Sequence, residues 1–129
     1  MNKKITVITV LLLLILILSA CNANAAAPEK TVESYLTAIV EADLTEISNL
    51  SCAEWEEDAW LELDSFQGVE VSLVDMQCSQ SGTDADNALV TCSGHFLTSY
   101  DGEAMEIDLS TREYELVQEG GNWLVCGYR

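Results

Sequence analysis

The chain has 129 residues, and its 22 acidic and 5 basic side chains give a formal net charge of −17 at neutral pH. This length allows one domain with a modest core, and a charge of this sign repels phosphate backbones, which argues against nucleic acid as a partner. Because 49% of the residues are hydrophobic and five are cysteine, the composition is that of a folded acidic domain and not of a disordered acidic tail.

The first 20 residues predict an export signal. Lys3 and Lys4 precede an apolar run over residues 5–18, which is too short for a comfortable membrane span. The run ends in Leu18-Ser19-Ala20-Cys21, which resembles the lipobox of bacterial lipoproteins, in which the cysteine is lipidated and the chain is cut just before it. The alternatives are an ordinary secretory signal or an uncleaved anchor.

The lipobox resemblance implies the organisation and the location of the protein. Residues 1–20 would be the signal peptide, residues 21–28 the lipidated Cys21 with a short tether, and residues 29–129 the domain. Lipid on Cys21 would anchor the protein to a membrane of the cell envelope, facing the extracytoplasmic side. Since the leader holds two basic residues and no acidic one, cleavage would take the net charge from −17 to −19.

The N-terminal half of the domain predicts three helices. Pro28 and Glu29 suit a first helical turn, and Asp43 with Glu46 has the form of a capping box that starts a short second helix through residues 47–50. Ser51 with Glu54 repeats that signature and predicts the start of a third helix. The predicted inner faces, at helical spacing, are formed by Val32, Tyr35, Leu36, Ile39 and Val40 in the first helix and by Cys52, Trp55, Ala59, Leu63 and Phe66 in the third.

After Gly68 the hydrophobic period becomes alternating, which predicts antiparallel strands. The pattern indicates a bulged strand over residues 69–78, a second strand over 88–100, a third from about 104 to 116 with a phase shift near 111–113, and a last strand over 123–128. Turn residues, among them Asp101-Gly102 and Gly120-Gly121, separate them. The predicted class is therefore α+β, with N-terminal helices on a curved antiparallel sheet of about four strands.

This order of elements resembles the nuclear transport factor 2-like, cystatin-like cone fold, and more narrowly small lipoproteins of that fold from bacteria such as Chloroflexi. The resemblance covers nearly the whole mature chain. It is carried by the helix over 32–42 and by Leu50-Ser51-Cys52-Ala53, Asp75-Met76-Gln77-Cys78, Val90-Thr91-Cys92-Ser93-Gly94, the segment 114–119 and Trp123-Leu124-Val125-Cys126-Gly127. It implies a curved sheet that wraps the helices, but no particular activity, because the fold hosts enzymes and adaptors alike.

Four cysteines remain after Cys21, and an even set in an exported domain predicts two disulfides. Cys78 and Cys92 flank the turn over residues 83–87 symmetrically, so they would face each other on paired strands and leave Cys52 for Cys126. Cys52 with Cys78 and Cys92 with Cys126 is the competing arrangement. The wide spacings and the single histidine argue against a metal site.

No motif assigns a catalytic residue or a cofactor. The residue types that could supply an acid or a base are Asp75, Asp108, His95, Tyr35, Tyr100 and Tyr114. We expect a pocket among Tyr35, Trp55, Trp60, His95 and Asp108. The sequence therefore favours a non-catalytic domain that binds a small ligand or a partner protein. The alternative is a small isomerase or dehydratase that acts on an apolar substrate, and a homodimer formed through the sheet is implied by the resemblance.

Overall fold

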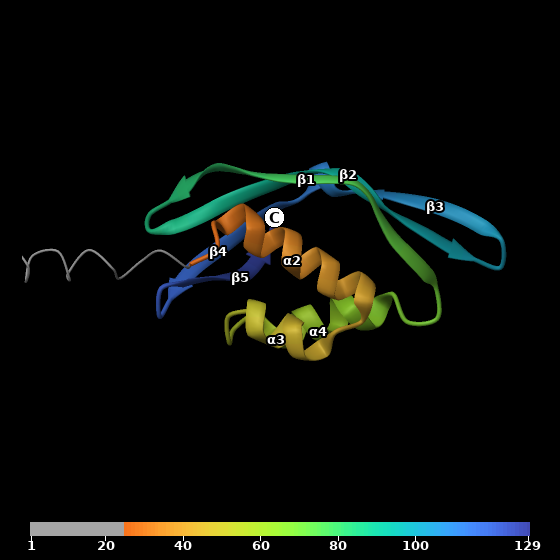
Figure 1. The fold of residues 1–129 in the computed structure, drawn as a ribbon, viewed down its shortest axis with the longest axis horizontal. Helices are drawn as coiled ribbons and strands as arrows, with labels where there is room; N and C mark the ends of the chain where they lie inside the picture. The colour runs from red at the N-terminus through yellow and green to blue at the C-terminus, as the bar shows by residue number, and fades with distance from the viewer. Residues whose placement is uncertain (1–24) are drawn as a thin grey trace, which may run out of the picture.

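The computed structural model describes residues 25–129 (Figure 1). The predicted signal peptide, Cys21 and the first part of the tether lie outside these residues. No helix within residues 25–129 is long and apolar enough to cross a membrane.

Three helices open the described chain: α2 (Pro28–Glu41), α3 (Leu44–Leu50) and α4 (Glu56–Ser65). As the sequence predicts, Pro28 begins α2 and the side chain of Asp43 caps α3 by accepting from the backbone N–H of Glu46. Figure 1 shows α2 lying between the sheet on one side and α3 and α4 on the other. The first helix is therefore covered from both sides, which explains why four side chains of its predicted apolar stripe, Val32, Tyr35, Leu36 and Ile39, are buried.

The third helix begins later than the sequence predicts. α4 starts at Glu56, and Ser51 instead forms a parallel bridge to Val125 of the last strand, while its hydroxyl donates to the carbonyl of Ile47. The predicted capping pair Ser51 and Glu54 is thus wrong, because the backbone of Cys52 is held by Val125 through a 2.9 Å hydrogen bond. The inner stripe nevertheless holds, since Cys52, Ala59 and Leu63 are all buried.

Five antiparallel strands make one sheet: β1 (Glu70–Asp84), β2 (Asn87–Tyr100), β3 (Glu103–Asp108), β4 (Glu113–Glu119) and β5 (Asn122–Tyr128). The predicted third strand is in fact β3 and β4, separated by a 3-10 turn, η1 (Leu109–Thr111). β2 pairs with β1 along one edge, and along the other with β3 at its C-terminal half and β4 at its N-terminal half. This break lets the sheet change direction, and the predicted bulge in β1 lies between Val74 and Gln77.

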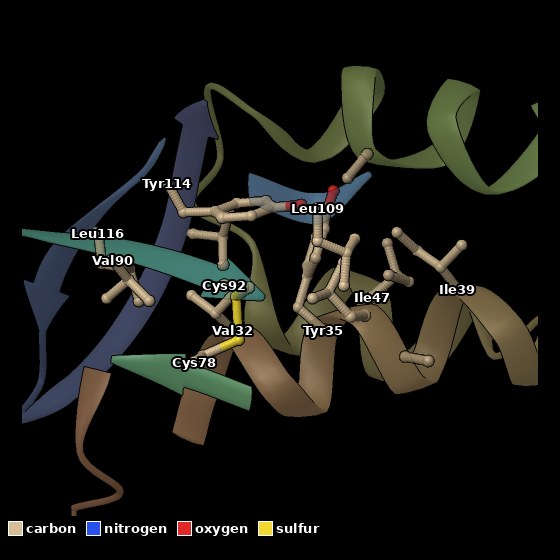
Figure 2. Packing of buried hydrophobic residues seen from close by; sticks show 14 of the residues in the cluster. Val32, Tyr35, Ile39, Ile47, Cys78, Val90, Cys92, Leu109, Tyr114 and Leu116 are labelled. Atoms are coloured by element: carbon tan, nitrogen blue, oxygen red, sulfur yellow. A yellow bond between two sulfur atoms is a disulfide. The ribbon is translucent and has the colours of Figure 1, made fainter. Parts of the chain in front are cut away.

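A single core lies between α2 and the sheet (Figure 2). Its largest fully buried side chains come from every layer, and they are Tyr35, Tyr114, Phe96, Leu36, Ile39, Ile47, Leu109 and Leu116. Phe96 packs against Phe66 with ring centroids 5.0 Å apart. Side chains from the helices and the sheet therefore fill this core.

Both disulfides join the residues of the first predicted pairing, Cys78 with Cys92 and Cys52 with Cys126. Cys78 and Cys92 are cross-strand partners in the β1–β2 hairpin, and Figure 2 shows this bond beside Val32 of α2. The second disulfide ties the segment before α4 to β5, across 74 residues of sequence. Each bridge removes conformational freedom from the unfolded chain.

Candidate functional site

A pocket of about 500 Å³ opens between α4 and the β2–β3 hairpin, and we call it the mouth pocket. Its apolar lining consists of Trp55, Leu61, Phe66, Val69, Met105, Ile107 and Tyr128, and its polar lining of Asp58, Glu62, Ser65, Thr98 and Arg112. Met105 and Leu61 are strongly exposed at the rim. A pocket of this size, with an apolar side and a few convergent polar groups, fits a small organic molecule.

A network of polar side chains closes the inner end of the mouth pocket. Glu62 on α4 forms an ion pair with Arg112, which precedes β4, and its second oxygen accepts a 2.8 Å hydrogen bond from the Tyr35 hydroxyl on α2. The indole N–H of Trp55 in turn donates to the Tyr35 oxygen at 3.1 Å. With only 7% of its side chain exposed, Glu62 is held by two residues that lie far from it in sequence, Tyr35 and Arg112.

The guanidinium of Arg112 lies 4.3 Å from the centroid of the Tyr128 ring, a cation–π geometry. Burial works against its charge, but the Glu62 carboxylate and the neighbouring tyrosines outweigh that effect and raise the pKa of Arg112. Arg112 therefore keeps its positive charge at neutral pH and lies against the carboxylate of Glu62. A ligand in the mouth pocket meets this ion pair.

Two tyrosine hydroxyls beside this pair stay protonated. Burial, and then the negative charge of Glu62, raises the pKa of Tyr35 well above its ordinary value and that of Tyr114 to about 12. Tyr114 is fully buried, and its hydroxyl has no hydrogen-bond partner among residues 25–129. At neutral pH both groups are neutral hydrogen-bond donors, so neither can act as a base.

Two of the five residues predicted to form a pocket, Tyr35 and Trp55, lie at the mouth pocket. Tyr35 and Trp55 meet through a hydrogen bond behind the mouth pocket, and Trp55 is part of its lining. Trp60 lies on a different face of α4, where its indole N–H donates to the Ser48 hydroxyl at 2.9 Å. The helical spacing predicts that Trp60 lies off the inner face of the third helix. In the structure Trp60 contacts α3.

His95 and Asp108 are cross-strand partners on β2 and β3 and do not line the mouth pocket. Asp108 caps η1, and its side chain accepts from the backbone N–H of Ser110 at 2.8 Å. These bonds, and the nearby His95, lower the pKa of Asp108. The Nε2 atom of His95 lies 3.6 Å from the Oε1 atom of Glu106, whose side chain is exposed. Of the other acid–base candidates, Asp75 and Tyr100 are exposed, so the candidates that share one polar cluster are Tyr35 and Tyr114.

Sequence reasoning missed Glu62 and Arg112, which form the centre of the site. Glu62 is one of six acidic residues between 54 and 64, and nothing local distinguishes it. A signal was available on the other side, because the domain has only three basic residues, Lys30, Arg112 and Arg129. Only the structure shows that Arg112 is the one of these three whose side chain is mostly buried, where a carboxylate partner compensates its charge.

No group of three or more histidine, cysteine, aspartate or glutamate side chains within residues 25–129 is arranged to hold a metal ion. The mouth pocket offers two carboxylates, Asp58 and Glu62, and the latter is already bound by Arg112.

The chain has the nuclear transport factor 2-like fold: three N-terminal helices packed on a five-stranded antiparallel sheet. Among solved structures it is similar to a crystal structure of a "putative ketosteroid isomerase" from Shewanella frigidimarina, with a TM-score of 0.53 over 80% of this chain and 93% of that chain. The sequence identity is 14%, so the likeness concerns the fold alone. No protein family matches the sequence, and no curated protein matches it.

Proposed function

We propose that the protein is an exported, lipid-anchored cell-envelope protein whose mouth pocket binds a small amphiphilic ligand without transforming it. The observation that carries this proposal is the base of the pocket, where Glu62 already accepts from Arg112 and from Tyr35. Both oxygens of this carboxylate are already bonded to fixed protein donors, so Glu62 is better placed to orient a polar group of a ligand than to abstract a proton from it. The binding role therefore fits better than acid–base catalysis.

The lining defines the ligand class. The apolar lining includes Phe66, Val69 and Ile107, which favour an apolar ring system. The polar lining includes Arg112, whose guanidinium has five N–H donors and bonds to Glu62 through one of its nitrogens. The expected ligand is thus a neutral molecule of one or two rings with a hydrogen-bond acceptor, because Arg112 is already paired with Glu62 and does not need a charged group on the ligand.

The binding experiment uses the full chain, exported and processed by its expression host and held in lipid nanodiscs. The probe is a fluoronaphthol, which is neutral at pH 7, followed by the broadening of its fluorine NMR line, with empty nanodiscs as the blank. Met105→Glu, at the rim of the mouth pocket, should weaken binding about tenfold. Tyr100→Glu is the matched control, because Tyr100 is as exposed as Met105, at 63%, and does not line the mouth pocket. Equal weakening by both variants, or no broadening beyond the blank, would refute the binding site.

The anchor is tested separately. With radiolabelled palmitate, the wild-type protein should carry label and sediment with membranes, whereas Cys21→Ala should be unlabelled and retain its leader. A wild-type protein that is released from the membrane with an unmodified N-terminus would show that residues 1–20 are an ordinary secretory signal.

A second candidate, an isomerase, is favoured by one feature: the buried Tyr114 hydroxyl has no partner among residues 25–129 and lies in the same polar cluster as Glu62. The similar solved structure is described as a "putative ketosteroid isomerase". Incubation with an unconjugated ketosteroid should then produce the ultraviolet band of a conjugated enone. Tyr114→Phe should abolish that band while leaving fluoronaphthol binding intact, and the absence of the band with wild-type protein would eliminate this candidate.

A further inference from the structure

A second, larger pocket of about 710 Å³ lies between α3 and α4, on another side of α4 from the mouth pocket, and we call it the α3–α4 groove. Leu44, Thr45, Ser48 and Asn49 line it from α3, and Glu57, Trp60, Leu61, Leu63, Asp64 and Gln67 line it from α4 and the turn that follows. Only Leu61 belongs to both pockets. The two pockets are therefore separate, and the role of the groove is independent of the proposed function.

The wall of the groove is apolar but open to solvent. Leu44, Trp60 and Leu61 are each about half exposed or more, at 53%, 46% and 62%. They lie together over two adjacent helices and are not scattered over the surface. Exposing a joined apolar surface of this kind costs free energy, and in soluble domains it marks a binding site.

The orientation of Trp60 is fixed. Its indole N–H donates to the Ser48 hydroxyl of α3 at 2.9 Å, so the polar edge of the ring is already bonded while the side chain stays nearly half exposed. A tryptophan face held in this way is a preformed surface for an apolar group or for a cation.

Two carboxylates flank this ring and set the sign of the charge that the groove attracts. Glu57 lies one turn before Trp60 and Asp64 one turn after it, on the same face of α4. Each of the three basic residues of the domain is paired with a different carboxylate, Lys30 with Glu33, Arg112 with Glu62, and Arg129 with Glu113 and Asp84. Within the described residues, Glu57 and Asp64 thus have no cationic partner, and the groove combines an aromatic face with uncompensated negative charge.

We propose that the α3–α4 groove binds a small organic cation with an apolar body, such as an aromatic quaternary ammonium compound. The cationic head would lie over the Trp60 ring between Glu57 and Asp64. The apolar body would contact Leu44 and Leu61. The volume of the groove is that of a small-molecule site, and the strongly acidic surface raises the local concentration of a cation.

The probe is benzyltrimethylammonium, titrated into the nitrogen-labelled full chain in nanodiscs and followed by the indole N–H signals in proton–nitrogen NMR. The Trp60 signal should shift in a saturable way, while the signals of Trp55 and Trp123 stay in place. Benzyl alcohol, which is neutral, and benzenesulfonate, which is an anion, should bind at least about twofold more weakly than the cation, because a cation–π contact at an exposed site is worth a factor of about two to five.

Calorimetry on variants tests the roles of the ring and of the charges. Trp60→Leu keeps an apolar side chain and should weaken binding of the cation about fivefold. The double variant Glu57→Gln, Asp64→Asn should weaken it about tenfold, in a manner that disappears at high salt. The matched control is Glu54→Gln, Glu103→Gln, which removes two exposed charges outside the groove and should leave the dissociation constant within about twofold.

Three outcomes would overturn this proposal: no saturable shift of Trp60, equal binding of benzyl alcohol, or equal weakening by the control variant. A concentration-dependent dimer in sedimentation, broken by Trp60→Leu, would also overturn it, since a second copy of the chain would then cover the groove. If the Trp60→Leu variant does not fold, the proposal can still be refuted, because the charge variants and the neutral probe are measured without it.

Discussion

The Tyr35 hydroxyl donates to the Glu62 carboxylate at 2.8 Å and so joins the first helix of the domain to the third. Trp55 donates to the same Tyr35 oxygen, and Arg112 completes the set on the far side of Glu62. One tyrosine therefore links the helical layer to the base of the mouth pocket. Removing the Tyr35 hydroxyl should change both the free energy of unfolding and the geometry of the mouth pocket.

Replacing Tyr35 with phenylalanine should lower the free energy of unfolding by about 2 kcal/mol, because a hydrogen bond to a buried carboxylate is lost and the ring is kept. Urea titration at pH 7 measures this change. Tyr100→Phe is the matched control, since Tyr100 is 63% exposed, and it should change the midpoint little. A loss below about 0.5 kcal/mol for Tyr35→Phe would show that water replaces the hydroxyl at no cost.

Replacing Glu62 with glutamine should destabilise the protein by about 3 kcal/mol, because it leaves the Arg112 charge buried and unpaired. Adding Arg112→Met should recover a large part of that loss, and a double-mutant cycle gives the coupling directly. Lys30→Met, which breaks an exposed ion pair, should have little effect. Additive effects of the Glu62 and Arg112 substitutions would mean that the pair is not coupled.

Stability should fall in alkaline solution because of Tyr114. Its pKa is raised from 10.0 to about 12 in the folded protein, so the folded state holds the phenol proton more tightly than the unfolded state does. This contribution is fully present below pH 10 and is lost as the pH rises towards 12. Tyr114→Phe should flatten that part of the curve, measured by unfolding at several pH values with the disulfides intact. If stability falls with pH equally steeply in Tyr114→Phe, the alkaline loss of stability comes from other groups.

Alanine at Gly94 should be far more damaging than alanine at Gly102. Both glycines have positive φ, +90° and +83°, but a Cβ at Gly94 would lie 2.5 Å from the carbonyl oxygen of Val74, where β1 bulges, and one at Gly102 would meet no atom within 4 Å. Gly102→Ala should thus cost about 1 kcal/mol, the backbone penalty alone. Gly94→Ala should cost at least twice as much in a denaturant titration, and equal costs would mean that the bulge simply moves.

The sequence by itself determined most of the architecture. The apolar period of 3.6 residues in α2, the Asp43 cap of α3 and the alternation in β1 and β2 are local signals, and each element formed where its own residues favour it. The pairing of Cys78 with Cys92 also followed from local order, because a hairpin places residues symmetric about its turn opposite each other. These features depend on neighbours in the chain, which the sequence displays directly.

Only the tertiary structure decided the features that depend on distant neighbours. Glu62 and Arg112 are 50 residues apart, and α4 starts late because the backbone of Cys52 bonds to Val125 of β5. β3 and β4 are separate strands because each pairs with a different half of β2. In each case the free energy comes from a hydrogen bond, an ion pair or a strand pairing that exists only after the chain has folded, so no local pattern records it.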